Sequence, residues 1–288
     1  MAHPAALVES INRSHGTHYR LVGPMPGGES ASSHAIRDDA GTEYLLKCGD
    51  SREFHAARTV EIATRLRAAG YPAPEYVASG DEGGLAYLMH KILPGKPLAA
   101  LTLPCMERII ELNGLQGDAA QGLEDGWPAR IVESIERGFE LWCRHDSMSR
   151  YSGETAAMLE ELQLTASTVR DGRFRTADAV HFDLNPANIL ENGGEISGVI
   201  DWNGCCAGDR GFDLATLGFY ALEDDRFARP LLERAQTISG RRPLALYLSH
   251  LILRQLDWSI RHHAPAVIDR YLRIARIALR AVQDLRAR

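Results

Sequence analysis

Residues 181–202 restrict the fold of this chain more than any other part of the sequence. They begin with HFDLNPANIL at His181 and close, after a short turn, with VIDW at Val199. Pro186 interrupts any helix here because proline has no backbone N–H to donate, and Asn185 favours a turn. We therefore expect a loop that follows a strand ending near His181. A hairpin is expected next, with strands at 189–190 and 196–200 and its turn at 191–194.

Side chains with oxygen donors recur in this stretch. The hairpin places Asn188 and Asp201 at its same end, and Asp183 lies on the adjoining loop. Two carboxylates and a carboxamide suit Mg²⁺ when phosphate oxygens complete the coordination. Taken one at a time, the residues have plainer interpretations: His181 and Asp183 as an exposed polar pair, and Asn188 as a turn residue. Together they predict a site that holds a divalent metal and activates a hydroxyl.

The composition excludes several classes of protein. With 288 residues, 45% of them hydrophobic, the chain can bury the core of one large domain or of two lobes. The net charge of −6 and the pI near 6.0 provide no basic field for nucleic acid or anionic membrane. Five cysteines, an odd number without a C-x-x-C pair, argue against a disulfide framework or a zinc ribbon. The sequence shows no secretory leader and no 18-residue apolar segment, so we expect a soluble cytoplasmic protein without nucleic-acid or membrane partners.

The first ninety residues predict an antiparallel sheet with one main helix. Short apolar runs lie between turn residues, and Leu7, Val8 and Ile11 have helical spacing. We expect helices at 4–13 and 52–69, and strands at 19–23, 34–37, 42–48, 75–79 and 85–92.

A turn rich in small residues joins the first two strands. It contains Gly28, Ser30 and Ser32, whose small side chains let backbone N–H groups come close to a phosphate. The segment has neither the Walker A pattern nor G-x-G-x-x-G. An ordinary hairpin loop is therefore the competing interpretation.

The third strand carries a lysine near its end, Lys47. A strand lysine that grips phosphates needs a carboxylate to hold its ammonium group, and the next helix offers Glu61 as first choice and Glu53 as second. Either glutamate also fits a solvated helix surface, and the spacing leaves the choice open.

A lobe boundary is expected at Pro94 and Gly95, just after the last of these strands. Residues 90–93 then form the connector, and we expect backbone groups around His90 and Ile92 to bind the edge of an adenine. The predicted lobes are 1–92, which holds the nucleotide, and 93–288.

From residue 98 onward the apolar pattern is helical, which makes the second lobe mostly α and the fold class α+β. Helices are predicted at 104–115, 129–146, 153–170, 226–239, 243–263 and 265–286.

The order H-x-D-x-x-x-x-N, then a strand, then Asp is typical of a kinase catalytic loop. On these residues the chain resembles kinases of the aminoglycoside phosphotransferase type, a family that also includes choline, fructosamine and other small-molecule kinases. The resemblance runs over nearly the whole chain and is most specific at 181–190, 199–202 and 208–215. Phe182 stands where glycine is usual. The resemblance implies a bilobal protein-kinase-like fold, with an antiparallel sheet lobe containing one main helix and a larger, mostly helical lobe.

The resemblance also implies a role for individual residues. Asp183 would orient the acceptor hydroxyl, while Asn188 and Asp201 would hold Mg²⁺ against the triphosphate. Lys47 would hold the α- and β-phosphates. ATP is the expected donor, with GTP as an open alternative. The residues expected to support the catalytic loop are His181 and Asp213.

Small molecules are the expected acceptors. A protein kinase needs room for an activation segment, whereas only 12 positions separate Asp201 from Asp213, and the H-R-D arginine and an A-P-E motif are missing. Acidic residues in the second lobe favour a cationic acceptor, such as an aminoglycoside or a basic peptide antibiotic. Solvated helix ends are the plainer interpretation of the same charges. The acidic residues are Asp209, Glu223, Asp224, Asp225 and Asp257.

We therefore expect an ATP- and Mg²⁺-dependent kinase with an alcohol group as acceptor, which phosphorylates an antibiotic and gives resistance. A metabolic kinase of a sugar, an amino alcohol or a glycated amine is the alternative in the same class. A catalytically weak nucleotide-binding regulator and an unrelated metal hydrolase are the alternatives from other classes. Both a monomer and a homodimer are compatible with the sequence.

Overall fold

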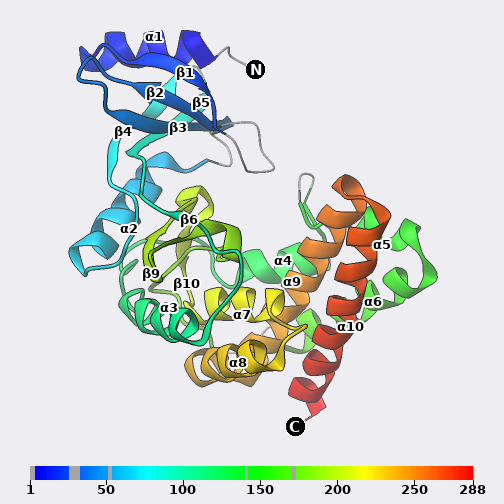
Figure 1. Ribbon diagram of the computed structural model, residues 1–288. Helices are drawn as coiled ribbons and strands as arrows, with labels where there is room; N and C mark the ends of the chain where they lie inside the picture. Colours follow the sequence, from blue (N-terminus) through cyan, green and yellow to red (C-terminus); the bar gives the residue numbers. More distant parts are fainter. Residues whose placement is uncertain are drawn as a thin grey trace. The chain divides into compact units, whose positions relative to one another are not determined.

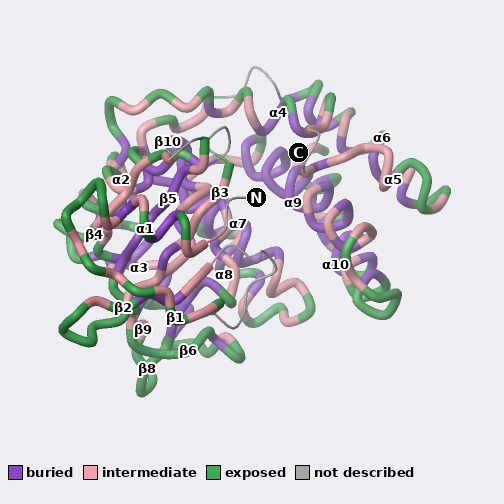
Figure 2. Tube along the Cα trace, turned by 90° about the horizontal axis from the view of Figure 1, so that it is seen from above, coloured by how far each residue is buried: buried purple, intermediate pink, exposed green. Residues whose placement is uncertain are grey.

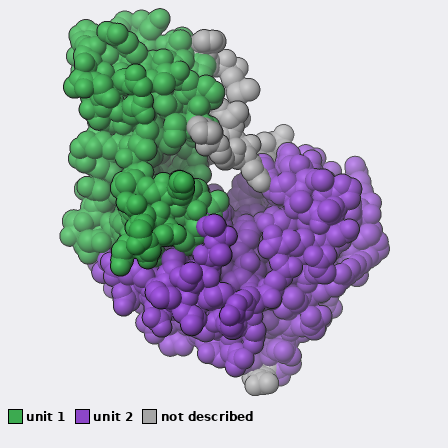
Figure 3. Space-filling model, viewed as in Figure 1, with its two compact units in different colours: residues 1–98, 187–205 green, residues 99–186, 206–288 purple. Residues whose placement is uncertain are grey.

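The computed structural model of the chain describes residues 4–25, 33–50, 54–82, 84–139, 142–169 and 173–287. The chain divides into two compact units, which are treated separately below (Figure 3). Unit 1 extends to Leu98, past the lobe boundary predicted at residue 92, and it also includes the hairpin that follows residue 186. The division into functional lobes stays a prediction. Unit 1 comprises Met1–Leu98 and Ala187–Cys205, and unit 2 comprises Ala99–Pro186 and Cys206–Arg288.

Unit 1 is built on an antiparallel sheet whose described strands follow the order β1-β2-β3-β5-β4 (Figure 1). Lys47 of β3 stands opposite Ser33 of β2 and Leu88 of β5, so this lysine lies on an inner strand. All the strands predicted for this region are present, with ends shifted by up to three residues. They are β1 Arg20–Pro24, β2 Ser33–Arg37, β3 Glu43–Asp50, β4 Tyr76–Glu82 and β5 Leu85–Lys91.

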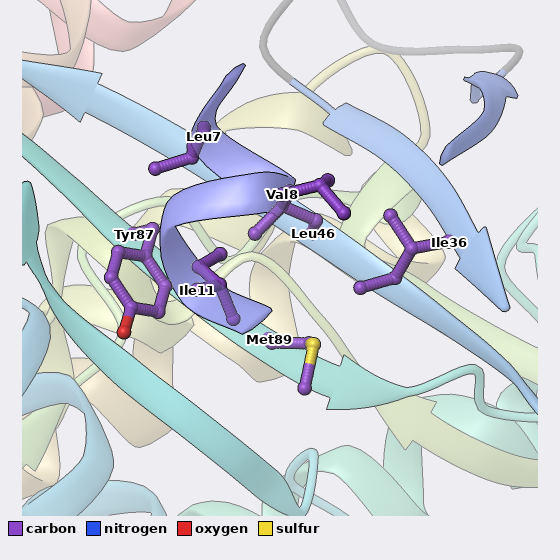
Figure 4. Packing of buried hydrophobic residues seen from close by; sticks show 7 residues of the cluster. All are labelled: Leu7, Val8, Ile11, Ile36, Leu46, Tyr87 and Met89. Atoms are coloured by element: carbon purple, nitrogen blue, oxygen red, sulfur yellow. The ribbon is translucent and has the colours of Figure 1, made fainter. Parts of the chain in front are cut away.

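Helix α1, Pro4–His15, packs against this sheet. Its buried side chains Leu7, Val8 and Ile11 share one face because they lie three and four positions apart. This core holds β3, and with it the backbone of Lys47, against the helix (Figure 4). The sheet contributes Ile36, Leu46, Tyr87 and Met89 to the same cluster.

A second, smaller sheet in unit 1 has the strand order β6-β8-β9. The predicted hairpin is present, and in it Ile189 pairs with Val199. Its turn is shorter than the predicted 191–194, because Glu191 and Asn192 belong to β8. Asn188 and Asp201 flank the Ile189–Val199 pair closely and therefore emerge at the same end of the hairpin. The strands are β6 Lys96–Pro97, β8 Ile189–Asn192 and β9 Glu195–Val199, and the main helix of the unit is α2 Ala56–Ala68.

Unit 2 is mostly helical, with α9, Arg241–His262, at its centre. Helix α9 contacts α4, α5, α6, α7, α8 and α10, and most of its length is buried (Figure 2). A helix surrounded in this way presents its side chains from fixed backbone positions. The other helices are α3 Leu103–Leu115, α4 Ala129–Glu136, α5 His145–Tyr151, α6 Gly153–Val169, α7 Gly211–Tyr220, α8 Asp225–Ser239 and α10 Pro265–Ala287.

The single helix predicted at 129–146 is wrong, because α4 ends at Glu136 and α5 begins only at His145. Between them Gly138 has a φ of 73° and Cys143 a φ of 56°, and neither conformation continues a right-handed helix. A Cβ at Gly138 would lie 2.6 Å from the Cys143 carbonyl oxygen, so this bend needs glycine. Apolar residues continue through the bend, which is why periodicity alone predicts one helix.

Two short antiparallel strands, β7 Asp178–Val180 and β10 Cys206–Gly208, lie in unit 2. Strand β7 ends one residue before His181, where the sequence predicts the end of a strand. Within the described ranges, no helix combines the length and hydrophobicity that a membrane span requires.

Candidate active site

Unit 1 contains a cleft of about 480 Å³ beside β3 and β5. Apolar side chains with a small set of polar groups are typical of a small-molecule site. The apolar lining includes Leu45, Leu88, Ile92, Leu93, Leu190 and Ile200, and the polar lining includes Ser33, Lys47, Tyr76, His90, Asn188, Asp201 and Asn203.

Lys47 contacts Asp201 and Asn203, which follow strand β9 in the same unit. Its Nζ lies 2.5 Å from Oδ1 of Asp201 and donates to Oδ1 of Asn203 at 2.9 Å. The lysine side chain is only 14% exposed, against 35% for Asp201, so the pair is partly shielded from water. The structure thus brings the predicted phosphate-binding cation and a predicted metal ligand together.

The expected partner of this lysine, Glu61, lies elsewhere. Glu61 is on the exposed face of α2 and pairs with Arg65 at 2.5 Å. The buried face of α2 carries Thr59 and Ile62 instead. Glu61, two positions after Thr59 and one before Ile62, points away from that face. The predicted Lys47–Glu61 pair is therefore wrong for this structure. The second choice, Glu53, lies outside the described residues.

Asn188 and Asp201 meet at the open end of the β8–β9 hairpin. The Ile200 N–H donates to the Asn188 carbonyl at 2.9 Å, which fixes the two segments side by side. Asn188 is 8% exposed. Among the residues described, no three His, Cys, Asp or Glu side chains gather as a metal site. Two oxygen donors fit Mg²⁺ whose remaining ligands come from phosphate and water.

Trp202 explains why Asp201 keeps its position. The Trp202 side chain is fully buried, donates from Nε1 to the Val199 carbonyl at 2.8 Å and meets Tyr71 edge to face. Thr59 of α2 donates to the Trp202 carbonyl at 3.3 Å. Asp201 itself has a φ of 68°, a left-handed conformation that aspartate tolerates better than most residues.

The residues expected to contact a nucleotide base also lie in this unit. His90 is buried, lines the cleft and has its Nδ1 2.8 Å from the Lys91 carbonyl oxygen. Burial lowers the pKa of His90, which favours the neutral form of its ring. Ile92 lines the same cleft. The predicted phosphate-contact residues of the small-residue turn, Gly28, Ser30 and Ser32, lie outside the described residues.

In unit 2 a buried carboxylate holds the catalytic-loop backbone. Asp213 of α7 accepts the N–H of His181 at 2.8 Å and that of Phe182 at 3.0 Å. Gln116 donates to the same carboxylate at 2.6 Å. Burial raises the pKa of Asp213, and these donors oppose that effect. The contacts are those that a supporting role for Asp213 requires, and Gln116 is a residue that the sequence patterns did not single out.

His181 is fully buried and contacts the next residue of functional interest. Its Nδ1 accepts the Asp183 N–H at 3.3 Å. Asp183 itself has a side chain that is 46% exposed. The loop thus buries its histidine and leaves the carboxylate of Asp183 accessible to a ligand.

Phe182 occupies a position suited to glycine. Its φ is 73°, a left-handed conformation that glycine adopts freely and a phenylalanine does not. The ring stacks on Phe212 at 5.2 Å between centroids and meets Trp142 edge to face. Arg130 lies 5.0 Å from the ring centroid. Packing of the large ring therefore compensates for the backbone strain at Phe182.

Arg254 of α9 is a further residue that the sequence did not single out. It donates to the Phe182 carbonyl at 2.7 Å and to Oδ1 of Asp183 at 3.2 Å. A lone arginine in a long amphipathic helix carries no motif, so no pattern could have marked it.

Two acidic residues expected to bind a cationic acceptor have structural partners instead. Asp209 is fully buried and accepts from the Gly211 N–H, Ser239 and Tyr247 at 2.9–3.0 Å. Burial raises the pKa of Asp209. Asp257 is also buried and receives two hydrogen bonds from Arg261 and one from Ser147. Both carboxylates are buried and hydrogen-bonded inside unit 2, so the structure does not support the prediction that Asp209 and Asp257 contact the acceptor.

The remaining acidic candidates lie at exposed positions. Glu223 pairs with Arg270 at 2.8 Å. Asp224 caps α8 by accepting the Arg226 N–H at 3.1 Å, which is a structural use of its side chain. The contact of Glu223 or Asp224 with an acceptor stays a prediction.

Phe182→Gly should be about 1 kcal/mol more stable than Phe182→Ala, because alanine keeps the left-handed strain without the packing. Phe219 in the interior of α7 is the matched control, since its φ is helical. There the order reverses, and Phe219→Ala should be about 1 kcal/mol more stable to unfolding than Phe219→Gly. Urea unfolding of the four variants measures both differences. The same order at both positions would contradict strain at Phe182.

Comparison with known proteins matches residues 22–247 to the phosphotransferase enzyme family. A thermostable mutant of aminoglycoside phosphotransferase APH(4)-Ia is similar in structure, with a TM-score of 0.62 and 20% identity over 96% of this chain and 97% of that one. Choline kinase LicA from Streptococcus pneumoniae has a TM-score of 0.64 and 15% identity over 98% and 100%. An aminoglycoside-3'-phosphotransferase of type VIII has a TM-score of 0.56 and 21% identity over 88% and 99%. No curated protein sequence matches the chain significantly.

These structures share a kinase-like fold with this chain, which confirms the predicted fold class of an N-terminal antiparallel sheet followed by a mostly helical part. The family match spans most of the sequence and confirms both the resemblance and the prediction of an enzyme. The chain belongs to the phosphotransferase enzyme family.

Proposed function

We propose that this enzyme transfers the γ-phosphate of ATP to a hydroxyl group of a small molecule. The observation that carries the proposal is the polar part of the unit 1 cleft, where Lys47 contacts Asp201 and Asn203 and where Asn188 also lines the wall. A lysine suits phosphate oxygens, and the oxygen donors suit a metal bound to the same phosphates. The apolar walls suit a purine ring. GTP remains the alternative donor.

Each side chain would have a separate task. Lys47 holds the α- and β-phosphates, and Asn188 and Asp201 hold Mg²⁺, which when bound neutralises charge on the phosphate oxygens. Asp183 accepts the proton of the acceptor hydroxyl and orients its oxygen for in-line attack on the γ-phosphorus. The bond from this oxygen to phosphorus forms while the bond to the ADP oxygen breaks. No nucleophilic side chain is needed for this reaction.

An antibiotic of the aminoglycoside or basic peptide type is the acceptor class that we propose first. Structures of the same fold include aminoglycoside phosphotransferases, one of them in a ternary complex with ADP and hygromycin B. Because Asp209 and Asp257 are engaged internally, recognition of a cation in unit 2 would depend on the exposed Glu223, Asp224 and Asp225.

A metabolic alcohol is the second acceptor class. The observation that favours it is the similar fold of choline kinase LicA, which covers 98% of this chain. The two classes share one chemistry at Asp183 and differ only in the acceptor.

Mg·ATP should raise the melting temperature of the wild-type protein, and Lys47→Ala and Asp201→Ala should remove most of that rise. Each substitution deletes a charge that would face the triphosphate or its metal. At a hundredfold excess of ligand over Kd the expected stabilisation is about 2.7 kcal/mol. Scanning fluorimetry with Mg·ATP, with Mg²⁺ alone and with ATP plus EDTA measures the shift.

Glu61→Ala is the control for this measurement, since Glu61 pairs with Arg65 on the exposed face of α2. It should keep the full shift. A full shift in both Lys47→Ala and Asp201→Ala would contradict nucleotide binding at the cleft. Loss of the shift in Glu61→Ala would restore the pairing that the sequence suggested.

Asp183→Asn should lower kcat at least about 100-fold, because an amide cannot take the hydroxyl proton, and should keep the Mg·ATP-induced melting shift. ADP release is measured across aminoglycosides, basic peptide antibiotics, macrolides and small metabolic alcohols, and mass spectrometry identifies the phosphorylated product. Equal turnover by wild type and Asp183→Asn would exclude Asp183 as the base. ADP release without a phosphorylated acceptor in any class would contradict small-molecule phosphorylation.

A further inference from the structure

The guanidinium of Arg254 contacts two successive residues of the catalytic loop at once. One nitrogen, Nη1, donates to the Phe182 carbonyl at 2.7 Å, and the other, Nη2, donates to Oδ1 of Asp183 at 3.2 Å. The planar fork of arginine matches two acceptors held at a fixed separation, which the single ammonium of lysine cannot do. Arg254 therefore binds the loop that carries Asp183 through two hydrogen bonds.

The Arg254–Asp183 contact is partly shielded from solvent. The Arg254 side chain is only 16% exposed, while the Asp183 side chain is 46% exposed. A charge-assisted hydrogen bond from a shielded guanidinium favours one rotamer of an exposed carboxylate. Arg254 therefore contributes to the orientation of the Asp183 carboxylate.

Arg254 is itself held rigidly. It projects from α9, which contacts six other described helices of unit 2. The guanidinium also lies 5.6 Å from the centroid of the Phe182 ring, and that ring is fixed by stacking on Phe212. A side chain placed by a packed helix and an aromatic face is more precise than one on a free loop.

We propose that Arg254 is a positioning residue for phosphoryl transfer, which orients the carboxylate of Asp183 toward the acceptor hydroxyl. This inference rests on the proposed function, because it assigns a task to the pair only if Asp183 is the base. A cation beside the carboxylate also offsets repulsion between Asp183 and a negatively charged phosphoryl group during transfer. Arg254 acts through Asp183 and does not bind the nucleotide.

The test measures ADP release from Mg·ATP with water as the acceptor, a reaction that needs no identified substrate. The rate that depends on Asp183 is the wild-type rate minus that of Asp183→Asn. Arg254→Gln should lower this rate at least tenfold and leave the KM for ATP within twofold, because the residue orients the base and not the donor. Arg254→Lys should fall between wild type and Arg254→Gln, since it restores the charge but only one contact.

Arg261→Gln provides the matched control. Arg261 lies on the same helix and binds a carboxylate, Asp257, through two nitrogens at 2.8 and 2.9 Å. Arg261→Gln should lower the melting temperature at least as much as Arg254→Gln does. It should leave the Asp183-dependent rate unchanged within twofold. A drop in rate for Arg254→Gln no larger than that for Arg261→Gln would overturn the proposal.

Chemical rescue separates positioning from a general loss of structure. In Arg254→Ala, methylguanidinium should raise the rate several-fold and reproduce part of the missing contact, whereas in Asp183→Asn it should have no effect. No response of Arg254→Ala would overturn the proposal.

A wild-type rate equal to that of Asp183→Asn would count against the proposed function and not against the contact. Crystal structures of wild type and Arg254→Gln then decide whether Arg254 orients Asp183. We expect the Asp183 side chain to adopt a different rotamer in Arg254→Gln from that in the wild type. An unchanged rotamer would overturn it.

Discussion

The carboxylate of Asp213 fixes the backbone of the proposed catalytic loop in unit 2. It is completely buried, and its two oxygens receive the N–H groups of His181 and Phe182 together with the amide of Gln116. Burying a carboxylate is costly unless donors replace the lost water, and here three donors do so. Because two of these donors are consecutive backbone groups, the residue that follows them, Asp183, starts from a defined position.

Positive φ angles occur at both carboxylate segments. Phe182, immediately before Asp183, has a φ of 73°, and Asp201 has a φ of 68°. Such conformations cost energy outside glycine and persist where neighbouring contacts outweigh them. Around Phe182 those contacts are the aromatic stack, the Asp213 carboxylate and Arg254, while beside Asp201 they come from the buried Trp202. Two of the four described non-glycine residues with positive φ thus lie at or next to a carboxylate of the candidate site, and the other two, Asp118 and Cys143, lie elsewhere.

Much of the fold follows from local patterns in the sequence. Alternating and continuous apolar runs identify the strands of the main sheet, and the turn residues after Leu190 identify the β8–β9 hairpin, although its turn is shorter than predicted. The main failure in helix assignment, at 129–146, comes from a bend at Gly138 that leaves the apolar pattern intact. The motif residues themselves were found because their spacing is local.

Side-chain partners that lie far apart in the sequence could not be predicted in the same way. The partner of Lys47 is Asp201, 154 positions away, whereas sequence order favoured the nearby Glu61. Asp209 looked available for a cation because nothing in the sequence shows that Tyr247, 38 positions away, will bind it. The partner of Asp257 is different, since Arg261 lies four positions away on the same helix, a spacing at which ion pairs are common. The Lys47–Asp201 and Asp209–Tyr247 pairings depend on tertiary packing, which composition and periodicity do not encode.

A crystal structure with Mg²⁺ and a non-hydrolysable ATP analogue tests nucleotide binding in the unit 1 cleft most directly. We expect the base between the apolar walls near Leu88 and Ile92, the triphosphate at Lys47, and the metal on the oxygens of Asn188 and Asp201. A nucleotide bound outside this cleft, or a metal held without Asp201, would contradict the account.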